Sequence, residues 1–239
     1  MHRLFTYGPY AEPQPTKETD IGEIPEHWEI ETIGQLCENG NGTVQTGPFG
    51  SQLHAADYVK NGIPSVMPQD IVDNRIVATN IAQISKEDHQ RLSRYQLFTG
   101  DIVYARRGDI GRRALVTENE NGWLCGTGSL FIRVGNSGIE PHFLHYYLGL
   151  PAITAWITSR AVGTTMLNLN TEILKSVPVA LPLKDEQQEI AAILDNIDKK
   201  TQVEESRKIA LEALFKSMLD QLMTGQIRVP CLAAADESG

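Results

Sequence analysis

The feature that most constrains this chain is a stretch of 40 residues, from Asp185 to Thr224, without glycine or proline. It is followed directly by Gly225, and a glycine in that place is typical of a helix C-terminus. One continuous helix of this length would be about 60 Å long, several times the usual helix of a globular domain. The sequence therefore predicts a single long helix over residues 184–226.

Apolar residues in this helix recur at heptad spacing, with a polar interruption at Thr201, Glu204 and Lys208. A heptad repeat is typical of a coiled coil, in which a second helix covers the apolar stripe. We expect this stripe to form a dimer interface, and the alternative is a helix that packs across the chain's own domain. The members of the stripe are Ile190, Leu194, Ile197, Leu211, Phe215, Met218 and Leu222.

The remaining sequence predicts an α+β domain of short strands and helices. Hydrophobic residues make up 41% and charged residues 21% of the 239 positions, which fits a globular protein. Prolines, glycines and few aliphatic residues mark 1–23 as a flexible N-terminal lead-in, followed by a domain over 24–183 and a tail over 227–239. Local patterns predict helices over 32–38, 85–94, 141–150, 152–160 and 170–176, and extended segments over 62–68, 75–77, 101–105, 114–116, 130–134 and 177–182.

Charge is unevenly distributed along the chain. The net charge of −9 divides into −6 for residues 1–42, +1 for 43–183 and −4 for 184–239. Residues 91–113 hold six arginines and no lysine. Arginine binds phosphate and guanine edges with a planar fork, so this pattern keeps nucleic-acid binding open despite the acidic average, although a solvated charged face is the simpler interpretation.

No motif indicates catalysis or a metal site. The chain lacks a phosphate-binding loop with lysine, a dinucleotide-binding glycine motif, a nucleophile elbow and a C-x-x-C pair. His142 and His145 are three residues apart on a predicted helix, but no third ligand accompanies them. Three scattered cysteines (Cys37, Cys125 and Cys231) and the lack of a signal peptide or a long apolar run indicate a cytoplasmic protein without a membrane span.

Three polar, glycine-containing segments are the candidate functional motifs. Thr46–Leu53 reads Thr-Gly-Pro-Phe-Gly-Ser-Gln-Leu, a tight loop that brings backbone N–H groups near a phosphate or, equally, a structural turn with Phe49 in the core. Gly100–Ala114 predicts a strand, an arginine-rich turn and a second strand, and its concentrated positive charge favours an anionic partner. Ala161–Asn168 is a polar loop before the last extended segment.

In this order, the three motifs resemble the specificity subunit of type I restriction–modification enzymes. The resemblance extends to Ile24-Pro25-Glu26-His27-Trp28, to Glu186-Gln187-Gln188-Glu189-Ile190 and to the segment from Leu214 to Gly225. It implies a target recognition domain followed by a helix that acts as a spacer. Full-length members carry two such units in tandem, whereas this sequence has one, so the resemblance implies a half-subunit that dimerises with its helices antiparallel.

The resemblance also implies the partners. These are double-stranded DNA, DNA methyltransferase subunits and, where present, restriction subunits, with S-adenosylmethionine bound by the methyltransferase and no cofactor or catalysis in this chain. Base-reading residues vary within such families, so we choose candidates by chemistry. The candidates for DNA contact are Arg106, Arg107, Arg112, Arg113, Thr46, Ser51 and Gln69.

Two other functions fit the same residues. One is a recognition module of another phage-defence methyltransferase complex. The other is an interaction protein whose long helix is the functional part and which does not bind DNA.

Overall fold

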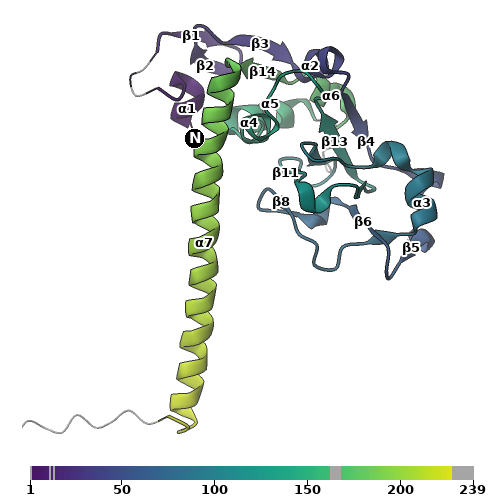
Figure 1. Cartoon of the computed structure of the whole chain (residues 1–239), viewed down its shortest axis with the longest axis vertical. Helices are drawn as coiled ribbons and strands as arrows, with labels where there is room; N and C mark the ends of the chain where they lie inside the picture. The colour runs from purple at the N-terminus through teal and green to yellow at the C-terminus, as the bar shows by residue number, and fades with distance from the viewer. Residues whose placement is uncertain (1, 11, 13, 162–167, 228–239) are drawn as a thin grey trace, which may run out of the picture. The chain divides into compact units, whose positions relative to one another are not determined.

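The computed structural model describes residues 2–10, 12, 14–161 and 168–227 of the chain (Figure 1). The chain divides into two compact units, Met1–Leu194 and Asp195–Gly239. Helix α7 (Lys184–Met223) contributes its first turns to the first unit and all of the regular structure described in the second.

The first unit is organised around a four-stranded antiparallel sheet in the order β11-β10-β13-β4. Its strands are β4 (Thr43–Thr46), β10 (Ile102–Ala105), β11 (Arg113–Leu115) and β13 (Ser129–Arg133). Strand β10 is buried on both faces, with Ile102 and Tyr104 in one apolar cluster and Val103 in another. Because successive side chains of a strand point to opposite faces, the sheet separates two cores.

Helices fill the core on the Tyr104 side of the sheet. Leu36, Phe143, Ile153 and Leu174 join this core from four helices. These helices are α2 (Ile33–Gly40), α4 (Pro141–Tyr147), α5 (Pro151–Arg160) and α6 (Thr171–Lys175), and the strand pair β3 (Glu29–Thr32) with β14 (Pro178–Leu181) completes the layer.

A second small sheet contributes to the cores on the Val103 side. Its order is β12-β6-β9-β5, with β12 parallel to β6 and the other pairs antiparallel. The elements here are β5 (Tyr58–Val59), β6 (Ile63–Val66), β9 (Gln83–Ile84), β12 (Leu124–Cys125), the hairpin β7 (Ile71–Val72) and β8 (Arg75–Ile76), and helix α3 (Lys86–Arg91). Asp73 and Asn74 form the hairpin turn with positive φ angles, as a two-residue turn of this kind requires.

The N-terminal segment differs from the expected flexible lead-in. Residues 1–23 contain helix α1 (His2–Tyr7), strand β1 (Thr16–Thr19) and the start of strand β2 (Gly22–Pro25), which pairs with β1. The Phe5 ring is buried, with its centroid 5.5 Å from that of Phe143. One aromatic anchor and one hairpin therefore order a segment whose composition gives little sign of structure.

The start of helix α7 is fixed to the first unit by a buried carboxylate. Glu186 accepts hydrogen bonds from the Leu183 backbone N–H (2.9 Å) and the Trp28 indole N–H (3.4 Å), and its Oε1 lies 3.0 Å from His27 Nε2. Burial raises the pKa of Glu186, but the contacts with His27, Leu183 and Trp28 outweigh burial and lower it overall. The resemblance motifs around Trp28 and Glu186 thus hold the helix at its first turn.

The predicted α+β fold with one long C-terminal helix is confirmed. The observed helix α7 begins at Lys184 and ends at Met223, so each of its ends lies one residue before the corresponding end of the stretch Asp185–Thr224. Gly225, two residues beyond the helix, has a φ of 71°. Each of the five shorter predicted helices overlaps an observed helix. Ser85 caps α3 through its side chain, as expected from its place before the helix.

Candidate nucleic-acid interface

Two of the three candidate motifs meet at one end of the central sheet. Strand β4 ends at Thr46, which pairs with Leu130, and strand β10 ends at Ala105, which pairs with Ser129. Both strands are antiparallel to β13, so the loops that leave them start beside the beginning of β13. The register thus brings the loop after Thr46 and the arginine-rich loop over 106–112 to the same end of the sheet.

Hydrogen bonds join these loops through the segment that precedes β13. The Gly47 N–H donates to the Ser129 carbonyl (2.9 Å), and the Arg106 N–H donates to the Gly128 carbonyl (2.9 Å). The Thr127 hydroxyl donates to the Pro48 carbonyl (3.0 Å). The three loops therefore form one connected surface, which we call the loop edge (residues 46–53, 106–112 and 126–128).

Glycine is required at position 47 for this arrangement. A Cβ atom at Gly47 would lie 2.1 Å from the Gly126 carbonyl oxygen, which is closer than non-bonded atoms approach. The backbones of the two loops can approach only because this side chain is absent. The first glycine of the motif is thus structural, and it sets the position of the residues that follow.

The three arginines of the loop edge differ in exposure and in their partners. Arg106 is half-buried and donates through Nε to Asn168 Oδ1 (3.1 Å), and the backbone of Arg107 pairs with that of Asn168. Arg107 itself is exposed. Arg112 is exposed and its Nε lies 3.4 Å from Asp109 Oδ2. Arg107 and Arg112 therefore present positive charge to solvent, while Arg106 supports the loop.

The expected DNA contact by Arg113 is corrected by its burial. Arg113 is 6% exposed and its Nε donates to the His145 carbonyl (2.8 Å) in the last turn of α4. Its guanidinium occupies the space where a side chain at Gly149 would be. Carbonyl groups in the last turn of a helix lack helical partners, and a cation there is favourable, so this arginine stabilises the end of α4.

The neighbouring His145 is neutral because it is buried beside this cation. Burial, together with the charges of Arg113 and His142, lowers the pKa of His145 to about 3. Its Nδ1 has no hydrogen-bond partner in the part of the chain that the structure describes. His142 and His145 therefore belong to the surroundings of a buried cation, which disfavours a metal ion there.

The polar candidates lie on or beside the loop edge. Thr46 is half-buried at the end of β4, and Ser51 is exposed in the loop that follows. Gln69 is exposed on the short 3₁₀ turn Pro68–Asp70, and its Nε2 lies 3.4 Å from Met67 Sδ. Pro68 lies against Gly128 of the loop edge, so Gln69 is close to the same surface.

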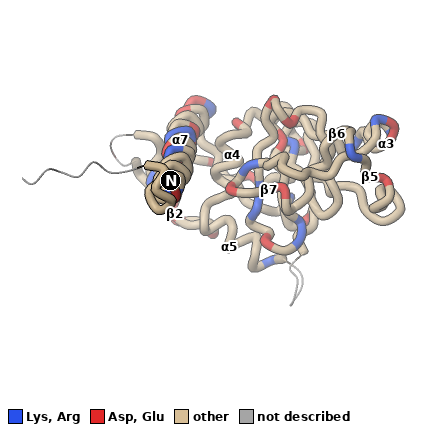
Figure 2. The backbone as a smooth tube through the Cα atoms, turned by 90° about the horizontal axis from the view of Figure 1, so that it is seen from below, with Lys and Arg blue, Asp and Glu red and all other residues tan. Residues whose placement is uncertain are grey.

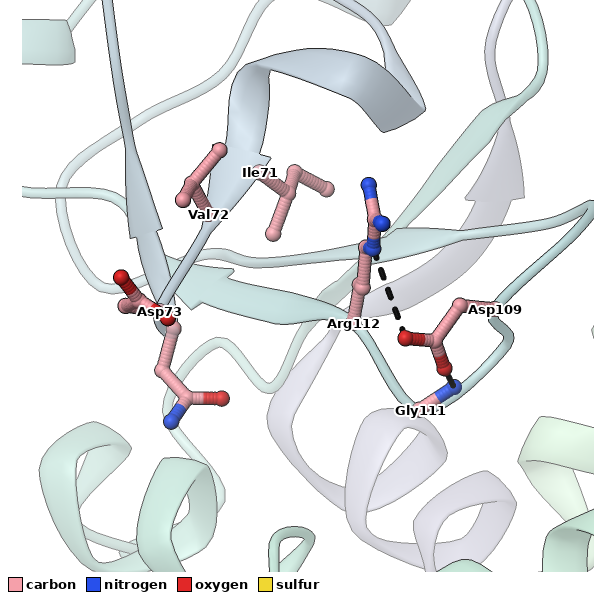
Figure 3. Close-up of a pocket in the computed structure, with 7 residues that line it drawn as sticks. Ile71, Val72, Asp73, Asp109, Gly111 and Arg112 are labelled. Carbon is pink, nitrogen blue, oxygen red and sulfur yellow. Dashed lines mark hydrogen bonds and ion pairs between the residues drawn. The ribbon is translucent and has the colours of Figure 1, made fainter.

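A cleft next to the arginine loop was not predicted from the sequence. Figure 3 shows its two sides, with Ile71 and Val72 on one and Asp109 and Arg112 on the other. Its volume is about 470 Å³, and the turn residues Asp73 and Asn74 also line it. The turn signal Asp-Asn between two short apolar runs indicates the hairpin, but only the contact of β8 with β11 places that hairpin beside Arg112.

Positive charge on the first unit is local. Figure 2 shows basic and acidic segments interspersed along the backbone. Several arginines have acidic partners, such as Arg91 with Asp88 and Arg133 with Asp101. The exposed arginines of the loop edge are thus a small cationic site and do not belong to a broad basic face.

The third predicted motif is described only at its ends. Residues 162–167 lie outside the described residues, so the prediction for most of this loop stays a prediction. Its last residue, Asn168, contacts both Arg106 and Arg107 as described above. The next residue, Leu169, donates its N–H to the Arg106 carbonyl (2.9 Å).

The apolar stripe of α7 divides into two parts. Ile190 and Leu194 are buried in the core of the first unit, so their expected place in a dimer interface is corrected to the domain core. Their heptad spacing reflects packing within the chain. The other five members, Ile197, Leu211, Phe215, Met218 and Leu222, are 41–70% exposed. We call these five the exposed stripe.

The structure offers little for redox or metal chemistry among the described residues. No group of three or more His, Cys, Asp or Glu side chains is arranged to hold a metal ion in the described ranges. Cys37 and Cys125 are buried free thiols, and burial raises the pKa of each, that of Cys37 to about 11. Among the described helices, none is long and apolar enough to cross a membrane.

Comparison with known families identifies the chain. The family model described as the type I restriction modification DNA specificity domain matches residues 25–213. The chain belongs to this family. The match begins at Pro25, within the Ile24–Trp28 motif, and includes the loop edge, the Glu186 anchor and helix α7 as far as Ala213.

Curated members of the family are about twice as long as this chain. The type I restriction enzyme MjaVIII specificity subunit of Methanocaldococcus jannaschii is 25% identical over 235 residues, which is 96% of this chain and 53% of that protein. The type I restriction enzyme EcoBI specificity subunit of Escherichia coli is 28% identical over 220 residues, which is 85% of this chain and 43% of that protein. The chain thus spans about half the length of these relatives.

Solved structures of specificity subunits share the fold. The HsdS subunit from Thermoanaerobacter tengcongensis matches 92% of this chain and 48% of its own length, with a TM-score of 0.56 and 19% identity. A chain from a structure of a type I R-M system matches 83% of this chain and 46% of its own, with a TM-score of 0.59 and 21% identity.

Proposed function

We propose that this specificity-domain chain is a non-catalytic DNA-recognition subunit of a type I restriction–modification system. In this role it reads one half of a split DNA site through the loop edge. The observation that carries the proposal is the convergence of two separate sequence motifs at one end of the sheet, where Arg107, Arg112 and Ser51 are exposed.

The chemistry of the loop edge suits contact with duplex DNA. Arginine forks bind phosphate oxygens and the O6 and N7 atoms of guanine, and hydroxyl and amide groups contact phosphates or base edges. The Asp109 carboxylate beside Arg112 competes with phosphate for that guanidinium. If Arg112 contacts DNA, its ion pair with Asp109 is replaced by one with a phosphate. No ion pair joins Arg107 to a described residue, so a phosphate contact by Arg107 does not require breaking one.

The exposed part of helix α7 suggests how two recognition domains are joined. We propose a homodimer in which two copies of the chain pair through their long helices in antiparallel orientation. The exposed stripe supports this proposal. Its five apolar side chains are in contact with water, and burying them against the same stripe of a second helix would stabilise the pair. Two identical recognition domains related by a two-fold axis then read a two-fold symmetric site.

The remaining partners follow from the same role. We propose that the dimer scaffolds methyltransferase subunits, which bind S-adenosylmethionine, and restriction subunits where the system has them. The chain itself carries no cofactor in this account. A cytoplasmic location fits a protein that acts on the host genome.

Binding to duplex DNA at several salt concentrations tests the recognition role. The complex of the chain with its methyltransferase subunits is expected to lose affinity as salt rises, because arginine contacts release counterions from DNA. Replacing the two exposed arginines, Arg107 and Arg112, together by alanine is expected to weaken binding and flatten that dependence. Unchanged affinity and slope in this double variant would remove the loop edge from the interface.

The dimer is tested by mass measurement in solution. Replacing Leu211 and Phe215 by glutamate places like charges in the exposed stripe and is expected to give monomers. A matched variant with Val203 and Ile209 replaced by glutamate is expected to stay dimeric, because these exposed apolar residues are at heptad positions that face away from the stripe. A dimer that survives the first pair of substitutions contradicts the proposed interface. A dimer without DNA affinity, even with the methyltransferase present, would favour the interaction-protein alternative.

A further inference from the structure

The loop edge carries one exposed aromatic side chain that the fold does not explain. Phe49 is 58% exposed, whereas the residues before it, Gly47 and Pro48, are buried. A phenylalanine is more often buried, because removing its large apolar surface from water stabilises the folded protein. Here the ring remains in solvent. This exposure favours a loop that contacts a ligand over a structural turn with Phe49 in the core.

The loop around Phe49 is held in place from both sides. On one side, Gly47 packs against Gly126, and Pro48 accepts a hydrogen bond from Thr127. On the other side, the Gln52 side-chain oxygen accepts hydrogen bonds from the Phe49 N–H (3.4 Å) and from the hydroxyl of the buried Tyr95 (2.8 Å). The exposed ring is therefore mounted on a backbone fixed to the domain.

The turn that follows Phe49 depends on the conformation of a glycine. Gly50 has a φ of 61°, in the left-handed region that favours glycine, and an added Cβ there would meet no atom within 4 Å. Glycine is thus used for its backbone conformation and not for lack of space. The next residue, Ser51, is exposed and polar.

The setting of Phe49 favours DNA over a protein partner. Protein–protein contact sites gather several apolar side chains around an aromatic anchor. In the loop Phe49 lies between the buried Pro48 and the exposed Gly50 and Ser51, and the loop after β10 presents Arg107 and Arg112 at the same end of the sheet. An exposed ring on a loop edge that also carries exposed hydroxyl and guanidinium groups resembles the apolar wedges of DNA-binding proteins, which insert between base pairs while basic groups hold the backbone.

We infer that Phe49 is a wedge that inserts between two neighbouring base pairs of the recognised half-site, unstacks them and bends the duplex. The inference rests on the proposed function. Wedges of this kind kink DNA by about 20–90°, and the cost depends on the sequence of the unstacked step. Phe49 therefore contributes to specificity at a step where no hydrogen bond reads a base.

The test uses the complex of the full chain with its methyltransferase subunits and a duplex of about 30 base pairs that contains the site the complex methylates. Energy transfer between dyes on the two DNA ends reports bending. 2-Aminopurine placed along the half-site, away from the base that the methyltransferase modifies and flips out of the stack, reports unstacking by the wedge. The variants are Phe49→Ala, which removes the wedge, and Phe49→Leu, which keeps an apolar side chain. Ile30→Ala on β3 is the control, since Ile30 is also exposed.

The wild-type complex is expected to bend the duplex and to raise 2-aminopurine fluorescence at one step. Phe49→Ala should lose both signals and about tenfold in affinity, which is about 1.4 kcal/mol, because the stacking of the aromatic ring on a base is lost. Phe49→Leu should retain most of the bending, and Ile30→Ala should behave as wild type. All variants should keep the wild-type melting temperature.

Three results would overturn the inference. If Phe49→Ala binds and bends DNA as wild type does, the wedge is wrong while the proposed recognition role stands. If Phe49→Ala no longer assembles with methyltransferase subunits, the ring is a protein contact. If the wild-type complex shows no site-specific binding, the proposed function itself fails, and the wedge fails with it.

Discussion

Arg113 and Arg107 come from the same short motif, and the structure predicts opposite consequences for their loss. Arg113 is buried and donates to the His145 carbonyl at the end of α4, whereas Arg107 is exposed on the loop edge. Arg113→Ala is therefore expected to destabilise the fold, and Arg107→Ala to leave stability unchanged.

The size of the Arg113 effect follows from two terms. Leaving the buried His145 carbonyl without its donor costs about 1–3 kcal/mol. Removing a long buried side chain that fills the space over Gly149 adds about 2 kcal/mol from lost packing. The expected loss is thus about 3–5 kcal/mol, which lowers the melting temperature of a chain of this size by about 10 °C.

Thermal unfolding followed by circular dichroism measures this difference, with Arg107→Ala as the matched control. Arg113→Met fills part of the space without restoring the hydrogen bond, so its melting temperature should fall between those of wild type and Arg113→Ala. If Arg113→Ala melts within 1–2 °C of wild type, about the shift that half a kcal/mol produces, the assignment of Arg113 as a buried cap of α4 is refuted.

Three further predictions use other parts of the structure. Arg107→Ala is expected to reduce the slope of log affinity against log salt by about 0.9 for one lost phosphate contact, and an unchanged slope in a binding titration would contradict that contact. The pKa of His145 is lowered from 6.5 to about 3 in the folded chain, so the unfolded state binds the proton more readily. The free energy of unfolding should therefore be highest above pH 6.5 and fall as the pH drops toward 3. Melting curves from about pH 7.5 to about pH 4 check this, and the decrease should be smaller in His145→Leu. Glu186→Gln should cost about 1–2 kcal/mol by weakening the contacts with His27 and Trp28, and a denaturant midpoint equal to wild type would show that this anchor contributes nothing.

Local sequence patterns predicted the elements well because their causes are local. The long helix follows from 40 residues that all tolerate helical geometry, and its end follows from one glycine. Helix α3 follows from a serine that can cap it. Such signals are contained within a few neighbouring residues.

The arrangement of the site depends on long-range pairing that no local pattern contains. Thr46 pairs with Leu130, and Ala105 with Ser129, so the meeting of the two loops is decided by the register of β13. The same pairing buries Arg113, because it lies opposite Tyr104 within β11, where the sequence pattern places the strand only from residue 114. Heptad spacing likewise does not distinguish the intrachain packing of Ile190 and Leu194 from contact with a second chain.

Sequencing of methylated bases in a host that carries this chain together with its methyltransferase subunits tests the central claim most directly. The account predicts methylation at a two-part motif whose halves are related by two-fold symmetry, and its loss when the chain is deleted. Methylation that persists without the chain would contradict a recognition role. A motif with two unrelated halves would contradict the homodimer.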